Sequence, residues 1–277
     1  MTLSPFFQHS FLFCSLLSLI LALFSLWIKK KPWIWGGFVI LSLFLAYSSH
    51  VLQPIAFIPC TLLFLSLIGL KASPSGLTRF ILVGATLIIS GGLFYGILPG
   101  FSSFLTISSF AINYGKLFAG ILLLSLYLHT IEDKSDLIFF MKTAFPISLL
   151  GSFIATAFIF YMHPPKSILF SSSSTVFYCI PLLVFQIIPE EAFFRGFIQK
   201  ELCQWTGSNI KGGFCAVVLS SLLFCLFNLL WVSYPILLGI FFILGLTYGF
   251  VYQITGRIEA SIFCRFITTL FYFFLPF

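Results

Sequence analysis

The stretch PEEAFFRGF, residues 189–197, places two adjacent carboxylates, Glu190 and Glu191, and one guanidinium, Arg195, at the end of a long apolar run. The chain contains only 7 acidic residues among 277, so two neighbouring ones are an exception to its composition. A carboxylate in or beside hydrocarbon costs several kcal/mol unless it is paired or reaches water. These residues are therefore the first candidates for a functional site.

The rest of the chain is too apolar to cover a water-facing surface. Hydrophobic residues make up 60% of it and charged residues 8%, whereas soluble domains carry roughly 25% charged residues. The composition predicts an integral membrane protein. The net charge of +7 comes without a basic patch interleaved with aromatic residues, so we expect no nucleic acid partner.

The apolar runs predict an all-α fold, a polytopic integral membrane helix bundle of about ten transmembrane helices, since ~20 apolar residues cross the hydrocarbon core. Lysines follow the first run instead of preceding it, so we expect a retained span and not a cleaved signal. The runs are 10–28, 33–50, 55–70, 80–98, 107–129, 143–162, 171–188, 212–231, 235–254 and 258–276.

The basic residues test this span count independently. With the N-terminus outside, the inward loops hold eleven lysines and arginines and the outward loops hold only Lys166, while Lys116 and Arg265 fall within spans. Cytoplasmic loops are enriched in Lys and Arg, so we expect both termini outside and the Glu190 segment at the cytoplasmic face. The lack of a targeting peptide favours a bacterial inner membrane. The inward residues are Lys29, Lys30, Lys31, Lys71, Arg79, Lys134, Lys142, Arg195, Lys200, Lys211 and Arg257.

On a helix, Glu191 and Arg195 are four residues apart and form a pairable couple. Glu190 lies about 100° round the helix from Glu191, so it is available as a general base. Pro189 is expected either to start this helix or to kink a longer one over 172–202. An ordinary ion-paired helix end beside the membrane is the simpler alternative, because such pairs are often only structural.

Glycines spaced four apart occur twice, at Gly92, Gly96 and Gly100 and at Gly245 and Gly249. Small residues at this spacing let helix backbones approach closely in lipid. We expect both sets to serve helix packing.

Neither the cysteines nor the histidines form a metal-ligand pattern. The chain has no CxxC and no HExxH, so we predict no metal, no cofactor and no disulfide framework. The residues concerned are Cys14, Cys60, Cys179, Cys203, Cys215, Cys225, Cys264, His9, His50, His129 and His163.

The sequence EEAFFRG, preceded by one span and followed by further spans, resembles the CPBP (Abi) family of intramembrane proteases. This family includes the CAAX prenyl endopeptidases and bacteriocin-processing or immunity proteins. Its first motif is EExxxR, commonly followed by glycine, and Glu190, Glu191, Arg195 and Gly196 match it. The similarity covers roughly residues 170–272.

The other two family motifs are altered. The second is FxxxH, and this chain has Phe224 followed by Asn228. The third is HxxxN, and here Arg265 and Thr269 take the two positions. We therefore divide the chain into residues 1–169, transmembrane helices without a motif, and residues 170–277, a CPBP-like protease core.

The resemblance implies a mechanism in which Glu190 activates a water that attacks a peptide carbonyl, while Glu191 and Arg195 form a structural pair. Its implied substrate is a hydrophobic or lipidated peptide or protein within the bilayer. Asn228 can donate to an oxyanion but cannot shuttle a proton. Arg265 can supply positive charge or pair with Glu190, and such pairing makes the carboxylate a weaker base. These replacements leave the activity open.

Two other functions remain open. One is a non-catalytic pseudoprotease that holds a hydrophobic peptide, a lipid or a partner helix. The other is a small transporter with Glu190, Glu191 and Lys116 along its pathway, which suits intramembrane ionisable residues although no repeat between the two halves is evident.

Overall fold

The computed structural model describes residues 5–29, 32–72, 76–101, 103–107, 110–130, 140–162, 179–207, 209–229 and 235–274. Contacts between residues divide the chain into two compact units, Met1–Glu132 and Asp133–Phe277. Both units are built mainly of helices, and the first also contains a two-stranded antiparallel sheet.

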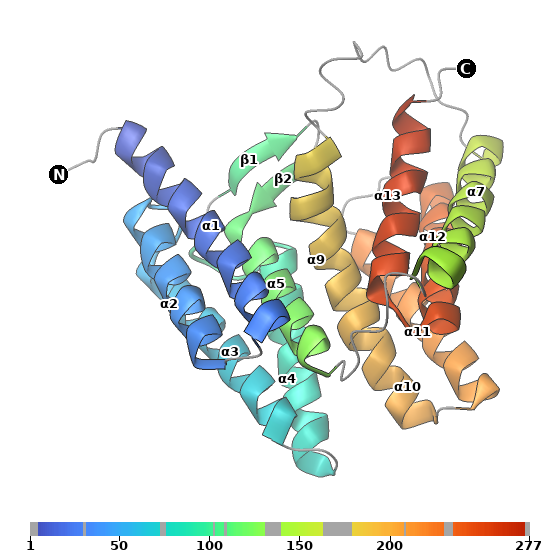
Figure 1. Cartoon of the computed structure of the whole chain (residues 1–277), viewed down its shortest axis with the longest axis horizontal. Coiled ribbons are helices and arrows are strands. Elements are labelled where there is room, and N and C mark those ends of the chain that lie inside the picture. Colours follow the sequence, from blue (N-terminus) through green and yellow to red (C-terminus); the bar gives the residue numbers. More distant parts are fainter. Residues whose placement is uncertain are drawn as a thin grey trace. The chain divides into compact units, whose positions relative to one another are not determined.

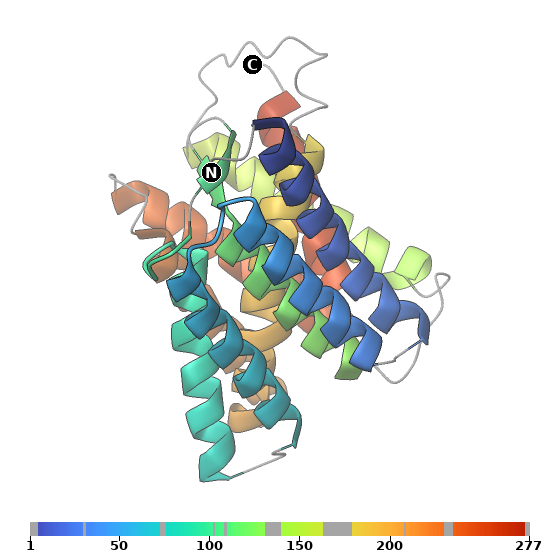
Figure 2. The same cartoon turned by 90° about the vertical axis from the view of Figure 1, so that its left-hand side faces the viewer.

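The first unit pairs α1 with α2 and α3 with α4, and α5 packs against α1, α3 and α4. Figures 1 and 2 show α1 running beside α2 in the blue part of the chain. The elements are α1 (Pro5–Lys29), α2 (Pro32–Ser48), a 3₁₀ turn η1 (Pro54–Ala56), α3 (Phe57–Ala72), α4 (Leu77–Phe94), β1 (Ser103–Ile107), β2 (Phe110–Asn113) and α5 (Tyr114–Thr130).

Hydroxyl groups join three of these helices inside the first unit. Ser15 on α1 donates to the carbonyl oxygen of Ser42 on α2 at 2.9 Å, and Ser42 donates back to the carbonyl of Ser15 at 2.9 Å. The hydroxyl of Tyr114 on α5 bonds to both serines. All three side chains are fully buried. Their mutual hydrogen bonds therefore satisfy hydroxyl groups to which lipid offers no hydrogen-bond partner.

The prediction of a membrane helix over 107–129 is wrong at its start. Strands β1 and β2 pair antiparallel, with Thr106 opposite Ala111 and Ile107 opposite Phe110, and the helix begins only at Tyr114. Threonine, isoleucine and phenylalanine favour strands. The span is therefore shorter than its apolar run, while the predicted all-α class holds apart from this one hairpin.

The packing prediction for the first glycine set is also wrong. Helix α4 ends at Phe94, and Gly96 and Gly100 follow it with φ of 64° and 95°. These left-handed values favour glycine and end a helix. A Cβ on Gly100 would lie 2.9 Å from the backbone nitrogen of Ala56. Gly96 and Gly100 therefore shape a tight turn and do not belong to a helix face.

The second unit contains the glutamate motif. Helix α11 packs along α12, and α7 packs against α12 and α13; Figure 1 shows α13 beside the gold helix labelled α9 and α10, which it contacts at α9. The elements are a π-helical turn η2 (Phe140–Ala144), α7 (Phe145–Met162), η3 (Leu183–Ile187), α9 (Ile188–Glu191), η4 (Ala192–Gln199), α10 (Lys200–Thr206), α11 (Ile210–Leu229), α12 (Pro235–Thr255) and α13 (Ile258–Phe274).

Pro189 does not start the motif helix. The described part of this helix runs from residue 179 to 206 without a break, and Pro189 lies inside it. Two π-helical segments, η3 and η4, flank the proline. Proline lacks a backbone N–H, and π turns are one way in which a helix accommodates a disrupted hydrogen-bond ladder.

Within the described residues, five helices are long and apolar enough to cross a membrane. Their exposed faces carry large apolar side chains, including Ile88, Phe153 and Ile210, as lipid contact requires. The serine run 171–174 lies outside the described residues. The candidate spans are Pro54–Ala72, Leu77–Phe94, Lys142–Tyr161, Ile210–Leu229 and Leu237–Thr255, with shorter apolar helices at Ser10–Ala22, Ile34–Ser48 and Tyr114–Leu126.

Candidate functional site

The two glutamates of α9 point into the second unit with different degrees of burial. The Glu191 side chain is fully buried, whereas 11% of the Glu190 side chain is exposed. A buried carboxylate needs charged or hydrogen-bonding partners, and these come from η4 and α13.

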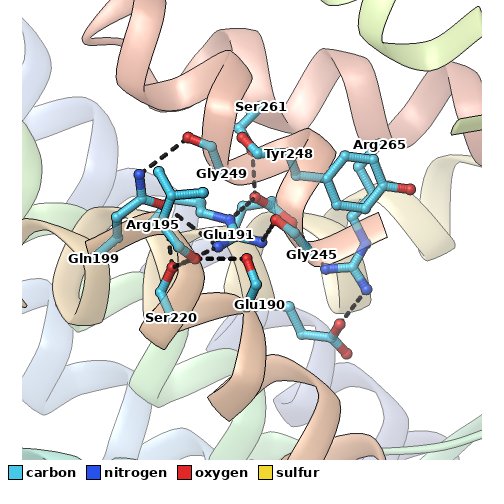
Figure 3. Close-up of polar contacts among 12 residues, drawn as sticks. Glu190, Glu191, Arg195, Gln199, Ser220, Gly245, Tyr248, Gly249, Ser261 and Arg265 are labelled. Atoms are coloured by element: carbon cyan, nitrogen blue, oxygen red, sulfur yellow. Dashed lines mark hydrogen bonds and ion pairs between the residues drawn. The ribbon is translucent and has the colours of Figure 1, made fainter. Parts of the chain in front are cut away.

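Arg265 on α13 bridges the two glutamates (Figure 3). Its Nη1 donates to Oε1 of Glu191 at 3.0 Å, and its Nη2 donates to Oε2 of Glu190. The sequence left open whether Arg265 pairs with Glu190, and the structure has it pair with both carboxylates. Glu190 is therefore not left without a charged partner.

Glu191 lies at the centre of the charged cluster. Its Oε2 accepts a hydrogen bond of 2.6 Å from the hydroxyl of Ser261 and lies 3.5 Å from Nε of Arg195. The expected ion pair between residues four apart on one helix is thus present. It is the longer of the two ion pairs that Glu191 makes, and the Arg195 Nε makes no hydrogen bond.

The other two nitrogens of the Arg195 guanidinium bond to a residue of its own helix and to residues of α11 and α12. Nη1 donates to the hydroxyl of Ser220 at 3.0 Å and to Oε1 of Gln199 at 3.3 Å. Nη2 donates to the carbonyl oxygen of Gly245 at 2.8 Å. These hydrogen bonds connect the motif helix to α11 and α12. Arg195 is fully buried, and its positive charge is balanced by Glu191.

Gln199 is part of the site and was missed by the sequence analysis. Its Nε2 donates to the carbonyl oxygen of Gly249 at 3.0 Å and to Gln253 at 3.4 Å, and its Oε1 accepts from Ser220 at 3.4 Å. Arg195 and Gln199 are one turn apart, as are the two glycine carbonyls that they reach. Both pairs are four residues apart in the sequence, and this equal spacing could have indicated that Gln199 contacts Gly249 as Arg195 contacts Gly245.

The second glycine set packs as predicted. A Cβ on Gly249 would lie 3.0 Å from Cγ1 of Val217 and 3.3 Å from Nη1 of Arg195. A Cβ on Gly245 would lie 3.1 Å from Cβ of Ser221. The close approach of α12 to α11 and η4 lets buried polar side chains reach backbone carbonyls of α12, so these glycines also build the site.

Asn228 and Thr269, which the sequence resemblance matches to positions of the second and third family motifs, bond within their own helices. The Asn228 amide donates to the carbonyl oxygen of Phe224 at 2.7 Å, and the Thr269 hydroxyl donates to that of Arg265 at 2.8 Å. Both side chains are partly exposed. The structure therefore brings Glu190, Glu191, Arg195 and Arg265 together, while the bonds of Asn228 and Thr269 are local.

Aromatic rings enclose the charged cluster. The Cζ of Arg265 lies 5.2 Å from the ring centre of Phe224 and 6.0 Å from that of Tyr248, within the range of cation–π attraction. Phe194 packs edge to face on Phe224 with ring centres 5.0 Å apart. These ring contacts pack against the guanidinium of Arg265 while its nitrogens pair with the two carboxylates.

The described residues contain no cluster of three histidine, cysteine or acidic side chains that could hold a metal ion, and the absence of a cofactor stays a prediction. His50 lies in the turn after α2. The side chains of His9 and His129 and all of His163 lie outside the described residues. Lys116, considered for a transport pathway, lies in the first unit with its Nζ 5.9 Å from the Phe94 ring centre.

The second unit is thus a bundle of apolar helices that holds a buried cluster of glutamate and arginine side chains. Residues 172–271 match the family described as type II CAAX prenyl endopeptidase Rce1-like. This match confirms, over these residues, the resemblance to the CPBP family that the motifs indicated. The matched range includes every residue of the candidate site. No curated protein and no solved structure matches the chain.

Proposed function

We propose that this protein is an intramembrane endopeptidase that cleaves a hydrophobic or lipidated protein, with Glu190 as the residue that activates water. The observation that carries the proposal is the difference between the two carboxylates. Glu191 is fully buried and bound by Arg195, Ser261 and Arg265, whereas part of the Glu190 side chain is exposed. Glu190 is thus the carboxylate that a water and a substrate can approach.

The reaction that suits these groups is general-base hydrolysis. The Glu190 carboxylate takes a proton from water as the water oxygen bonds to the peptide carbonyl carbon, and the C–N bond then breaks with the proton passing to the leaving amine. Arg265 stabilises the oxyanion, because an arginine carries five N–H donors and the two ion pairs with the glutamates engage only Nη1 and Nη2. Asn228 supplies a further donor when its amide turns from the Phe224 carbonyl.

A specific observation favours a second function, that of a non-catalytic protein that binds a hydrophobic protein segment. Arg265 pairs with Glu190 directly, and a paired carboxylate is a weaker base. The second motif has Asn228 where the family has histidine, which removes a proton-transfer group. The same apolar bundle then holds the segment without cutting it.

We also propose how the chain is oriented in the membrane. About ten spans, both termini outside and the Glu190 segment at the cytoplasmic side of a bacterial inner membrane agree with the distribution of basic residues. Residues 1–169 then form helices without a motif and residues 170–277 form the protease-like core.

The test is cleavage of a lipidated membrane protein by purified protein in liposomes. We expect Glu190→Gln to lower the rate by about 10²-fold or more, because it removes the general base. Glu259→Gln is the matched control, since Glu259 is exposed in the first turn of α13, and it should leave the rate unchanged. Equal cleavage by wild type and Glu190→Gln would contradict the proposed base. Equal binding without cleavage by either would favour the binding protein.

A further inference from the structure

Gln199 is a fully buried glutamine whose two amide atoms face opposite kinds of partner (Figure 3). Its Oε1 accepts a hydrogen bond of 3.3 Å from Nη1 of Arg195 and one of 3.4 Å from the Ser220 hydroxyl. Its Nε2 donates to the carbonyl oxygen of Gly249 at 3.0 Å and to Oε1 of Gln253 at 3.4 Å. A flipped amide would place its NH₂ group against the guanidinium and its oxygen against the Gly249 carbonyl. The partners therefore fix the orientation of this amide.

The guanidinium of Arg195 is held at its two terminal nitrogens by neutral acceptors. Nη1 donates to Gln199 and to the Ser220 hydroxyl, and Nη2 donates to the carbonyl oxygen of Gly245 at 2.8 Å. Nε lies 3.5 Å from Oε2 of Glu191 and makes no hydrogen bond. The attraction between two charges depends on their distance and not on the angle of a bond. The neutral acceptors therefore decide which edge of the guanidinium faces Glu191.

We propose that Gln199 is a positioning residue of the site: its Oε1 holds Nη1 of Arg195, so that the Nε edge of the guanidinium faces Glu191. The inference rests on the proposed function for its chemical meaning. Glu191 also accepts a hydrogen bond from Nη1 of Arg265, and Nη2 of Arg265 pairs with the proposed base Glu190. Gln199 thus acts on the reaction through Arg195.

The second acceptor of Nη1, the Ser220 hydroxyl, does not replace Gln199. A hydroxyl group rotates and both donates and accepts, whereas an amide oxygen only accepts. Ser220 can also donate to the carbonyl oxygen of Val217 at 3.0 Å, so its hydroxyl has a partner other than the site. The Gln199 oxygen is fixed instead, and it fits because a Cβ on Gly249 would lie 3.2 Å from it.

NMR of the purified full-length protein in detergent micelles, with isotopically labelled arginine, tests this without enzymatic activity. Rotation about the Nε–Cζ bond exchanges Nη1 and Nη2, so slow rotation gives two Nη signals and fast rotation gives one averaged signal. Wild-type Arg195 should give two signals, which Arg195→Lys lacks. Gln199→Met keeps the length of the side chain without its hydrogen bonds. It should speed the rotation of Arg195 about tenfold or more, because a hydrogen bond to a charged group is lost.

The spectrum is simple because the chain has four arginines, which are Arg79, Arg195, Arg257 and Arg265. The bonds of Arg265 to the two glutamates do not involve Gln199, so its signals should stay unchanged and serve as the internal reference. Gln204→Met is the matched control, since Gln204 is exposed on α10, and it should leave the rotation of Arg195 unchanged.

If Gln199→Met does not fold, Gln199→Asn takes its place, because an amide one methylene shorter cannot span Arg195 and Gly249 together. It should give the same increase in the rotation rate. One averaged Nη signal for wild-type Arg195, or an equal rotation rate in wild type and a folded Gln199 variant, would overturn the inference.

Cleavage kinetics in liposomes connect this geometry with the reaction. Gln199→Met should lower kcat about tenfold and leave KM within about twofold, because Gln199 is fully buried and changes the position of other groups. A role in packing alone would lower the folded fraction and leave kcat per folded molecule unchanged, so that result would overturn the positioning role. If wild type does not cleave, the endopeptidase proposal fails, whereas the rotation rates still decide whether Gln199 orients Arg195.

Discussion

Arg265 donates through Nη1 to Oε1 of Glu191 at 3.0 Å and so joins α13 to α9 across 74 positions of the sequence. We propose that this arginine replaces the histidine of the third family motif. It contributes a permanent charge where histidine would contribute a titratable group. The same substitution therefore changes both the packing of α9 on α13 and the chemistry that Glu190 can perform.

We expect Glu191→Leu to destabilise the second unit by about 3–5 kcal/mol, because it leaves two buried guanidinium groups without their shared carboxylate. Unfolding in mixed detergent micelles measures the change. The exposed Glu259 on α13 provides the control, and Glu259→Leu should stay within about 0.5 kcal/mol of wild type. Equal stability of the two variants would show that the Glu191 contacts contribute nothing to the fold.

Restoring both histidines tests the motif alignment. We expect Asn228→His/Arg265→His to cleave a lipidated substrate about 10²-fold faster than wild type, because it supplies two acid–base groups and releases Glu190 from Arg265. Time courses in liposomes give the rates, and each single variant serves as a control. An unchanged rate in the folded double variant would count against matching Asn228 and Arg265 with the family histidines.

The motif segment could be predicted from sequence because its pattern is local. The ion pair of Glu191 with Arg195 follows from the four-residue spacing of a helix, and the pairing is present at 3.5 Å. The family resemblance over about 170–272 agrees with the match over 172–271. Close packing at Gly245 and Gly249 also follows from local spacing.

The contacts that complete the site could not be predicted because they join helices far apart in the chain. Arg195 reaches Gly245 and Gln199 reaches Gly249 across 50 positions each, which depends on how α12 is rotated. Hydropathy alone also extended one span into the strands before Tyr114, since apolar β-branched residues suit both structures.

Glycine at position 249 is required by the contacts of the site. A Cβ there would lie 3.0 Å from Val217 Cγ1, 3.2 Å from Gln199 Oε1 and 3.3 Å from Arg195 Nη1. We expect Gly249→Ala to lower the free energy of unfolding by about 1–3 kcal/mol through overpacking. Gly239 lies in the same helix with nothing within 4 Å of its Cβ position. Gly239→Ala should therefore be neutral or stabilising by up to about 1 kcal/mol, because alanine favours helix. Unfolding of both variants in mixed micelles gives the comparison, and a Gly249→Ala protein as stable as Gly239→Ala would contradict the tight packing of α12 on Arg195 and Gln199.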